Sequence, residues 1–451
     1  MLPSTDTTVK KRHYAVDLMT LFYLFFTYLR VKICVYPKNV ITLHTNIGTM
    51  IATINRIQVK QVTDKKGMDA FVQFPKSLYA GVSQYVPDMD SDIRDTFKPS
   101  KNKSLANADI QAFVAFRDGE VAGRIAGIIS HKANEIWQKK VVRFSMIEFI
   151  EDINVAEALI AAVEEWGYKR GMTSIQGPMG ITDFDKEGML IEDFEMGGSF
   201  LEYWNPPYYK DFMEKLGFKK EADWLQIRIE VPEKVPAKYA RVAQLSKEMF
   251  GLKIVKKSKK DVYRGYGQKI FDLLNQAYAP LFGFSPFTPE QAQDFLKKYV
   301  PLLNMKMLTF IENEKDELVC VAITVADFSD GLKKSKGKVF PKGWYHLLKA
   351  IKWKTGNKAE LMIIGIRPDM QGLGINALVF DHLIPIYNKM GIKWCETGPQ
   401  LEDNVRELSQ WKPLNPSIVK RRRCWKREID AATFTTTLYH RKHSTGKAAK
   451  E

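Results

Sequence analysis

Hydrophobic and polar positions along the chain predict strands that alternate with amphipathic helices. Residues 305–310 and 318–326 are apolar runs on either side of a short polar stretch, which predicts a β-hairpin. Before this hairpin, residues 266–279 and 289–300 have the three- and four-residue spacing of helices. The second of these begins with a Thr-Pro pair, which is typical of a helix start.

The most informative segment is residues 360–377, in which an apolar strand starts at Glu360 and ends at Pro368. Gly372 and Gly374 come shortly after it, and an amphipathic helix begins at Ile375. A strand, a glycine loop and a helix start together present backbone N–H groups to a phosphate. The spacing matches neither the three-glycine dinucleotide fingerprint nor a P-loop. The alternative is an ordinary strand-to-helix turn, in which glycines serve only the backbone angles.

Pro368 and the residues from 371 to 376 resemble the pyrophosphate loop of the GNAT acyltransferases. Gln371 and Gly374 fit that family's pattern, whereas Asn376 stands where Gly or Ala is usual. The resemblance implies that the preceding strand, with Ile364 and Ile366, pairs with the pantetheine arm of acyl-coenzyme A. It also implies that the pyrophosphate is bound by Gln371, Gly372, Leu373, Gly374, Ile375 and Asn376.

The order of the predicted elements agrees with this resemblance. Residues 392–395 are a short strand and residues 417–429 a last strand, which completes the GNAT order. Between them, Asn404 and Trp411 are similar to the family's Asn-x6-Tyr, where the Tyr often acts as general acid. A tryptophan cannot protonate a leaving thiolate, so the usual acid is in doubt at this position.

The N-terminal part of the chain repeats the same order. Residues 112–130 predict a hairpin, residues 144–150 a strand and residues 154–170 a helix. Where this copy should carry its glycine loop, it has the acids Glu151 and Asp152. Carboxylates at a helix start would repel coenzyme A. We therefore interpret the first copy as a degenerate half that does not bind coenzyme and has a structural or acceptor-binding role.

The predicted fold class is α/β (α+β), with two tandem GNAT-like domains, each a mixed, mostly antiparallel twisted sheet flanked by helices. A chain of 451 residues is long enough for two or three domains. Over residues 57–429 it is similar to an uncharacterised bacterial family of twin GNAT-like proteins. The predicted parts are an N-terminal extension (1–49), a degenerate GNAT-like domain (50–232), an acyl-CoA-binding GNAT-like domain (233–430) with a basic insert (330–358), and a polar tail (431–451).

The first 49 residues have two interpretations. Residues 16–29 are mostly apolar, but this run is shorter than the ~20 residues that span a bilayer as a helix. Lysines and an arginine precede it, yet no small-residue cleavage site follows. One interpretation is an upstream start codon, with Met50 as the true start. The other is an amphipathic or single-anchor segment that attaches the protein to a membrane.

A net charge of +16 indicates an acidic partner. The insert is rich in lysine and interleaves these lysines with aromatic residues, among them Trp344 and Trp353. This composition is typical of an element on an anionic membrane surface. A solvated lid is the alternative. No recognised nucleic-acid motif is present, and four scattered cysteines predict a reducing cytoplasm and no metal site. We expect a cytoplasmic protein, with peripheral attachment to the inner membrane face as a second option.

The resemblance implies acyl-CoA as donor and an amine as acceptor. The amine must lose a proton before it attacks the thioester, and the oxyanion must be stabilised. The candidate bases are Glu360, at the start of one predicted strand, and Glu396, at the end of the next. Each could equally be a solvated strand-end acid. A backbone N–H near Ile366 would meet the oxyanion.

Three functions remain open from the sequence. The first is an acyl-CoA-dependent N-acyltransferase that transfers an acetyl or longer acyl group to a primary amine, including a lipid-like amine. The second is a tandem-GNAT transferase that uses aminoacyl-tRNA, although such enzymes lack the glycine loop. The third is a GNAT-fold binding protein without catalysis, which the missing Tyr favours.

Overall fold

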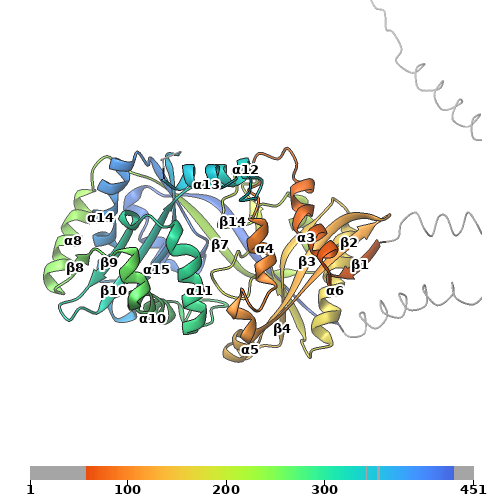
Figure 1. Ribbon diagram of the computed structural model, residues 1–451. Coiled ribbons are helices and arrows are strands. Elements are labelled where there is room, and N and C mark those ends of the chain that lie inside the picture. The colour runs from red at the N-terminus through yellow and green to blue at the C-terminus, as the bar shows by residue number, and fades with distance from the viewer. Residues whose placement is uncertain (1–56, 342, 353–355, 431–451) are drawn as a thin grey trace, which may run out of the picture. The chain divides into compact units, whose positions relative to one another are not determined.

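A computed structural model describes residues 57–341, 343–352 and 356–430 (Figure 1). The predicted N-terminal extension, the polar tail and Trp353 lie outside the described residues. Among the described helices, none combines the length and the apolar character that crossing a membrane requires.

The strands of the described residues form one 14-stranded mixed sheet. Its order is β1-β2-β3-β4-β5-β14-β7-β12-β11-β10-β9-β8, with β6 paired to β14 and β13 paired to β7. The strands are β1 (Ile57–Gln61), β2 (Ala108–Arg117), β3 (Glu120–Ser130), β4 (Val141–Phe149), β5 (Ser174–Gly177), β6 (Met189–Glu192), β7 (Lys219–Glu230), β8 (Lys253–Val255), β9 (Leu308–Glu312), β10 (Leu318–Ala326), β11 (Lys358–Ile366), β12 (Trp394–Thr397), β13 (Gln400–Leu401) and β14 (Ser417–Glu428).

Helices flank this sheet, and several begin with the caps that their sequences predict. Thr288 and Gln291 form a capping box at the start of α11, with Pro289 in its first turn. The principal helices are α3 (Lys65–Leu78), α4 (Asp90–Thr96), α5 (His131–Ile136), α6 (Ile153–Tyr168), α7 (Tyr208–Lys215), α8 (Ala237–Met249), α10 (Gly267–Tyr278), α11 (Pro289–Tyr299), α12 (Ser329–Ser335), α13 (Gly343–Lys352), α14 (Ile375–Met390) and α15 (Val405–Ser409).

The two halves repeat one arrangement. In the first, the β2–β3 hairpin is followed by β4, α6 and β5; in the second, the β9–β10 hairpin is followed by β11, α14 and β12. In each half the strands before and after the helix are parallel. By contrast, β9 is antiparallel to β10, and β3 is antiparallel to β4. The predicted fold class, two tandem GNAT-like halves with mixed sheets, is confirmed.

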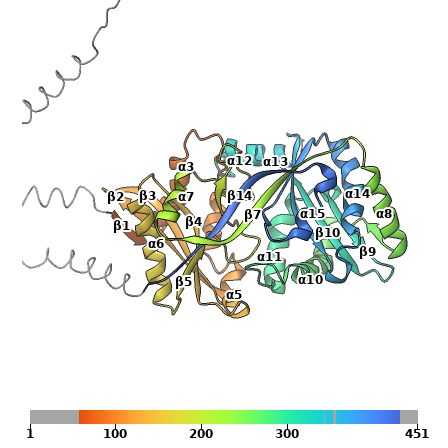
Figure 2. The same cartoon turned by 180° about the vertical axis from the view of Figure 1, so that it is seen from behind.

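The halves share their last strands. β7, the last strand of the first half, pairs with β12 of the second half, and β14 pairs with both β5 and β7. Figure 2 shows β7 and β14 side by side between the two groups of strands. Both halves lie within a single compact unit of the chain. The predicted boundary at residues 232–233 therefore follows a strand that completes the sheet of the other half.

Most predicted element boundaries agree with the structure to within three residues. The first strand of the second hairpin begins later than predicted, at Leu308, because Met305–Met307 form a 3-10 turn capped by the Asn304 side chain. The basic insert contains α12 and α13, separated by a turn that includes Phe340.

Candidate functional site

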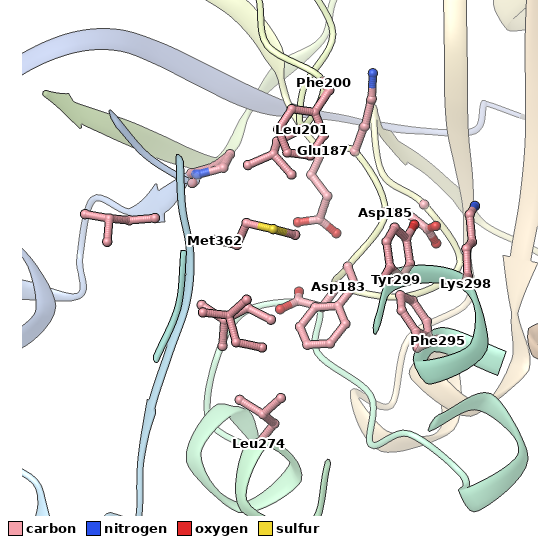
Figure 3. A pocket seen from close by; sticks show the side chains of 18 of the residues that line it. Asp183, Asp185, Glu187, Phe200, Leu201, Leu274, Phe295, Lys298, Tyr299 and Met362 are labelled. Carbon is pink, nitrogen blue, oxygen red and sulfur yellow. The ribbon is translucent and has the colours of Figure 1, made fainter. Parts of the chain in front are cut away.

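A cavity of about 600 Å³ lies beside β11 and is the natural place to look for a substrate. Its walls come from β11, α10, α11, α15 and an irregular segment at residues 180–187. Most of the lining is apolar, and Figure 3 shows Leu274, Phe295 and Met362 around the open space. The cavity thus combines residues of both halves.

The open edge of β11 forms one wall of this cavity. β11 pairs with β12 only from Lys358 to Leu361, and Gly398 N donates to Leu361 O at 3.0 Å where the strands part. Beyond that point Met362 and Ile364 line the cavity. A parted pair of parallel strands leaves backbone groups of β11 available to an extended ligand.

The glycine loop joins β11 to α14. Gln371 Nε2 donates to Ile366 O at 3.1 Å, which folds the loop back on the end of the strand. Gly372 and Gly374 have φ values of +80° and +81°, which favour glycine. Gly374 is the N-cap of α14 and no side chain caps this helix. The first-turn amides lack intrahelical partners, so the loop presents donors that suit an anion.

The loop is supported from α8. Ser246 Oγ donates to Leu373 O at 2.7 Å. A Cβ on Gly374 would lie 2.6 Å from Ser246 Oγ and 2.6 Å from Val242 Cγ1, whereas a Cβ on Gly372 would meet nothing within 4 Å. Gly374 is therefore required by packing as well as by its backbone angle. Ile375 is buried beneath the loop, and Asn376 follows it in the first turn of α14.

Asn404 and Trp411 both line the cavity, but neither provides a free acid. Trp411 Nε1 donates to Gln400 Oε1 at 2.8 Å, and its ring packs against Phe380. Asn404 caps α15 and its Nδ2 donates to Glu407 Oε2 at 2.9 Å. Burial raises the pKa of Glu407 to about 7, although the Asn404 hydrogen bond opposes this shift. Glu407 is thus a titratable group at the position where sequence reasoning found only a missing Tyr.

Acidic side chains of the segment at residues 180–187 enter the cavity from the first half. Asp185 is held within the segment, because its Oδ2 accepts from Thr182 N at 2.9 Å and from Thr182 Oγ1 at 3.2 Å. Burial raises the pKa of Asp183 to about 7 and that of Glu187 well above its ordinary value. Figure 3 shows the Asp183 and Glu187 carboxyl groups turned toward the same space beside Met362.

Glu360 and Glu396, the bases predicted from the sequence, do not line the cavity. They are buried in an ion network instead, in which Lys358 Nζ lies 2.6 Å from Glu360 Oε1 and 2.9 Å from Glu396 Oε2. Burial raises the pKa of Glu360 well above its ordinary value, against the effect of Lys358. Both groups thus lie outside the lining of the cavity, and their role as base stays a prediction.

The same network connects the halves. Lys420 of β14 is 1% exposed, and its Nζ lies 2.8 Å from Glu202 Oε1 and 2.5 Å from Glu396 Oε1. Although burial opposes it, the charges of Lys420 and Arg422 lower the pKa of Glu202 to about 2. Much of the basic run near the chain's end therefore has acidic partners inside the protein.

Sequence reasoning missed Asp183 and Glu187 as site residues. A signal was present, because three acids occupy the alternate positions 183, 185 and 187 between the apolar residues Ile181 and Met189. Among the described residues, no cluster of His, Cys, Asp or Glu side chains is arranged to hold a metal ion.

Two curated bacterial proteins are similar to this chain along most of their length. Protein YghO of Escherichia coli is 26% identical over 382 residues, which cover 82% of this chain and 95% of YghO. The bacterial ceramide synthase of Caulobacter vibrioides is 23% identical over 321 residues, which cover 71% of this chain and 82% of that enzyme. No known family profile matches the chain.

One of two similar solved structures supports the fold assignment. A GCN5-related glucosamine N-acetyltransferase region of a fungal multi-domain β-N-acetylglucosaminidase has a TM-score of 0.51 and 12% identity, with 83% of this chain and 38% of that longer chain covered. A tandem GNAT protein from clavulanic acid biosynthesis has a TM-score of 0.49 and 12% identity, with 83% and 99% covered. The chain has the GNAT fold of N-acyltransferases, as its glycine loop predicts.

Proposed function

We propose that this protein is an acyl-CoA-dependent N-acyltransferase whose acceptor is a primary amine with a long apolar chain. The observation that carries this proposal is the continuity between the open edge of β11 and a large apolar cavity. A small polar amine would not need such a lining, because burial of apolar surface is favourable only for an apolar ligand.

The donor is assigned to the second half. The glycine loop with Gln371 and Gly374 would hold the pyrophosphate at the uncapped start of α14. The pantetheine arm would extend along β11 at Ile364 and Ile366, which brings the thioester to the point where β11 and β12 part. A backbone N–H of β11 at that point, rather than the predicted one near Ile366, would then stabilise the oxyanion.

The acceptor class is supported by the cavity and by one relative. That relative is named a ceramide synthase, and the formation of a ceramide joins an acyl group to the amine of a long-chain base. The cavity of about 600 Å³ has room for a long alkyl chain, and its acids suit the amine end.

A membrane surface would deliver such an acceptor. The turn before α13 exposes 76% of Phe340, and the helix itself exposes 47% of Trp344, 45% of Tyr345 and 36% of Leu348. Lysines accompany these residues in the insert, so the surface combines apolar and cationic groups. The insert begins with α12, whose Leu332 lines the cavity. We propose peripheral binding to an anionic membrane at the cytoplasmic face.

The test is a transfer assay with the full-length protein, acyl-CoA donors of increasing chain length and long-chain primary amines. Thiol release and mass spectrometry of the product would report transfer, and calorimetry with coenzyme A would report donor binding. We expect one coenzyme A per chain and an amide product. Coenzyme A binding without transfer to any amine would favour a binding protein, and no binding at all would reject the proposal.

Vesicle co-sedimentation tests the membrane surface separately. Anionic vesicles should bind the protein at low salt and release it as salt rises. Replacing Phe340 and Trp344 by Ala should weaken the binding, whereas the same change at Tyr263, an exposed aromatic residue of the second half, should not. Vesicle binding that changes neither with salt nor with these substitutions would exclude this surface as the membrane-binding site.

A further inference from the structure

Glu187 is a buried acid with an unused hydrogen-bonding atom. Its side chain belongs to a residue that is only 7% exposed, and its Oε1 has no hydrogen-bond partner among the described residues. Figure 3 shows this carboxyl group directed into the cavity, near Asp183. A buried carboxyl oxygen without a partner costs free energy in the folded protein, so its surroundings suit a ligand that donates hydrogen bonds.

Arg143, whose charge opposes the raised pKa of Glu187, forms no ion pair with that acid within the described part of the chain. Arg143 of β4 is 5% exposed, but its Nη1 donates to Gly180 O at 2.9 Å and its Nη2 donates to Gly283 O at 3.2 Å. Arg143 thus holds the backbone around the acids in place. Its charge lowers the pKa of Asp183 but does not cancel the effect of burial. Burial raises the pKa of both acids despite the charge of Arg143, so their ionised forms would be stabilised by a cationic ligand.

We propose that Glu187 and Asp183 bind the ammonium group of the acceptor and accept its protons during acyl transfer. This assignment rests on the proposed function and adds to it the amine subsite and the base. The two carboxyl groups come from the first half, whereas the donor loop belongs to the second. The site is therefore complete only where the halves meet.

The proton balance explains why two acids suit this reaction. An ammonium ion has three N–H protons and the amide product keeps one. The first proton passes to one carboxylate, which leaves a neutral amine whose lone pair attacks the thioester carbon. The second leaves the nitrogen as the C–N bond forms and the C–S bond breaks. One proton ends on the coenzyme A thiol and the other passes through a carboxyl group to solvent.

Charged and titratable groups around the pair set its pH dependence. They are Arg143 on β4, Asp185 on the same segment, Lys298 on α11, Tyr278 on α10, Glu407 on α15 and Cys424 on β14. Burial is the main effect and keeps the pair partly protonated near neutral pH. An entering ammonium favours the ionised acids, so amine binding should strengthen as pH rises through about 7.

Glu407 is the rival acid in this cavity. It is bonded to Asn404 and belongs to the cap of α15, so one of its oxygens already has a donor. Glu187 has an oxygen without one. This difference makes Glu187 the better ammonium ligand, and an experiment can separate the two acids.

The test compares a cationic probe with a neutral probe of equal length. Binding of dodecylamine and of dodecanol would be measured by calorimetry with the full chain, for Glu187→Gln, Asp183→Asn and Glu407→Gln. Glu195→Gln, an exposed acid in the same half, is the matched surface control. We expect Glu187→Gln and Asp183→Asn to weaken dodecylamine binding by at least about 10-fold and dodecanol binding hardly at all.

Coenzyme A affinity and pH profiles complete the test. Both variants should keep wild-type coenzyme A affinity, and their dodecylamine binding should depend less on pH near 7 than that of the wild type. Unchanged dodecylamine binding in both variants, or a loss confined to Glu407→Gln, would overturn the assignment. If the wild type binds dodecylamine but not coenzyme A, the proposed acyl transfer fails while the ammonium subsite stands.

Discussion

The two halves of this protein use the same strand–helix–strand unit in different ways. α6 lies between the parallel strands β4 and β5, α14 lies between β11 and β12, and both helices have 16 residues. Asp152 caps α6, because its carboxylate accepts from Asn154 N at 3.0 Å. Gly374 stands at the same place before α14 and offers no side chain.

If the proposed function holds, this difference divides the reaction between the two halves. At a helix start capped by its own carboxylate, that carboxylate already accepts from the first backbone N–H groups. At an uncapped start these groups can bind an external anion. Under the proposed function, the second half binds the donor, and the first half has given up that role and supplies acids for the acceptor. The shared strands β7 and β14 hold these two parts in one sheet.

The largest effect is expected where the halves are joined. Replacing Lys420 by Met leaves Glu202 and Glu396 buried without their shared cation, which should cost about 3–5 kcal/mol of unfolding free energy. Urea denaturation would measure it. Lys426→Met on the same strand is the control, because that lysine pairs with exposed Glu428. A loss no larger than the control's would show that the halves do not depend on this network.

The second largest effect, on coenzyme A affinity, is expected at the glycine loop. Gly372→Asp adds an anion at a position where a side chain meets no atom and where Asp tolerates the backbone angle. Coenzyme A affinity should fall on the order of 100-fold, from charge repulsion at the phosphate site. Gly372→Asn adds a side chain of nearly the same shape without the charge. It should therefore lower coenzyme A affinity much less. Calorimetry on both variants distinguishes charge from shape, and equal losses would contradict a phosphate site.

The acids from the first half should show a cost to stability. The pKa of Asp183 is about 7 in the folded protein against an ordinary value of 3.8, so the folded state binds this proton more tightly than the unfolded state. The cost is small below pH 4, grows as pH rises and is complete above pH 7. Asp183→Asn should therefore stabilise the protein by about 1 kcal/mol at pH 8, and by less at pH 5. Thermal unfolding at both pH values checks this, and destabilisation at pH 8 would indicate a structural role.

The smallest effect is expected at the capped helix. Asp152→Asn keeps a capping side chain but removes the charge, and Glu151→Gln removes the neighbouring one. If the first half has no donor site, coenzyme A affinity should change by less than about 2-fold and stoichiometry should stay at one per chain. A second binding event in either variant would show that charge alone had closed this half.

Local patterns predicted most of the fold. The helices and hairpins around Thr288, Gly372 and Gly374 could be predicted because caps, turns and apolar spacing act within a few residues. The sharing of β7 and β14 between the halves could not be predicted, because strand partners far apart in sequence leave no local signal. The glycine loop could be predicted for the same reason as the helices, because its pattern lies within a few consecutive residues.

The role of each acidic side chain could not be predicted from local sequence either. Glu360 and Glu396 were chosen as bases because they lie at strand ends, but their side chains join Lys358 within the protein. Asp183 and Glu187 lie on an irregular segment whose path depends on Arg143, a residue of a distant strand. A carboxyl group's chemistry is set by its surroundings, which only the assembled halves define.

The exchanged strands also constrain how the chain is made. β5 has β14 as a neighbour, with Gly177 opposite Trp425, so the first half emerges from the ribosome with a sheet edge that its own residues do not fill. Its partner follows only after the second half has been synthesised, roughly 10–50 s later at about 5–20 residues per second. During that time the exposed edge is open to pairing with other nascent chains. Efficient production of this protein should therefore depend on chaperone protection of the growing chain, and a ribosome that stalls before residue 417 would release an aggregation-prone fragment.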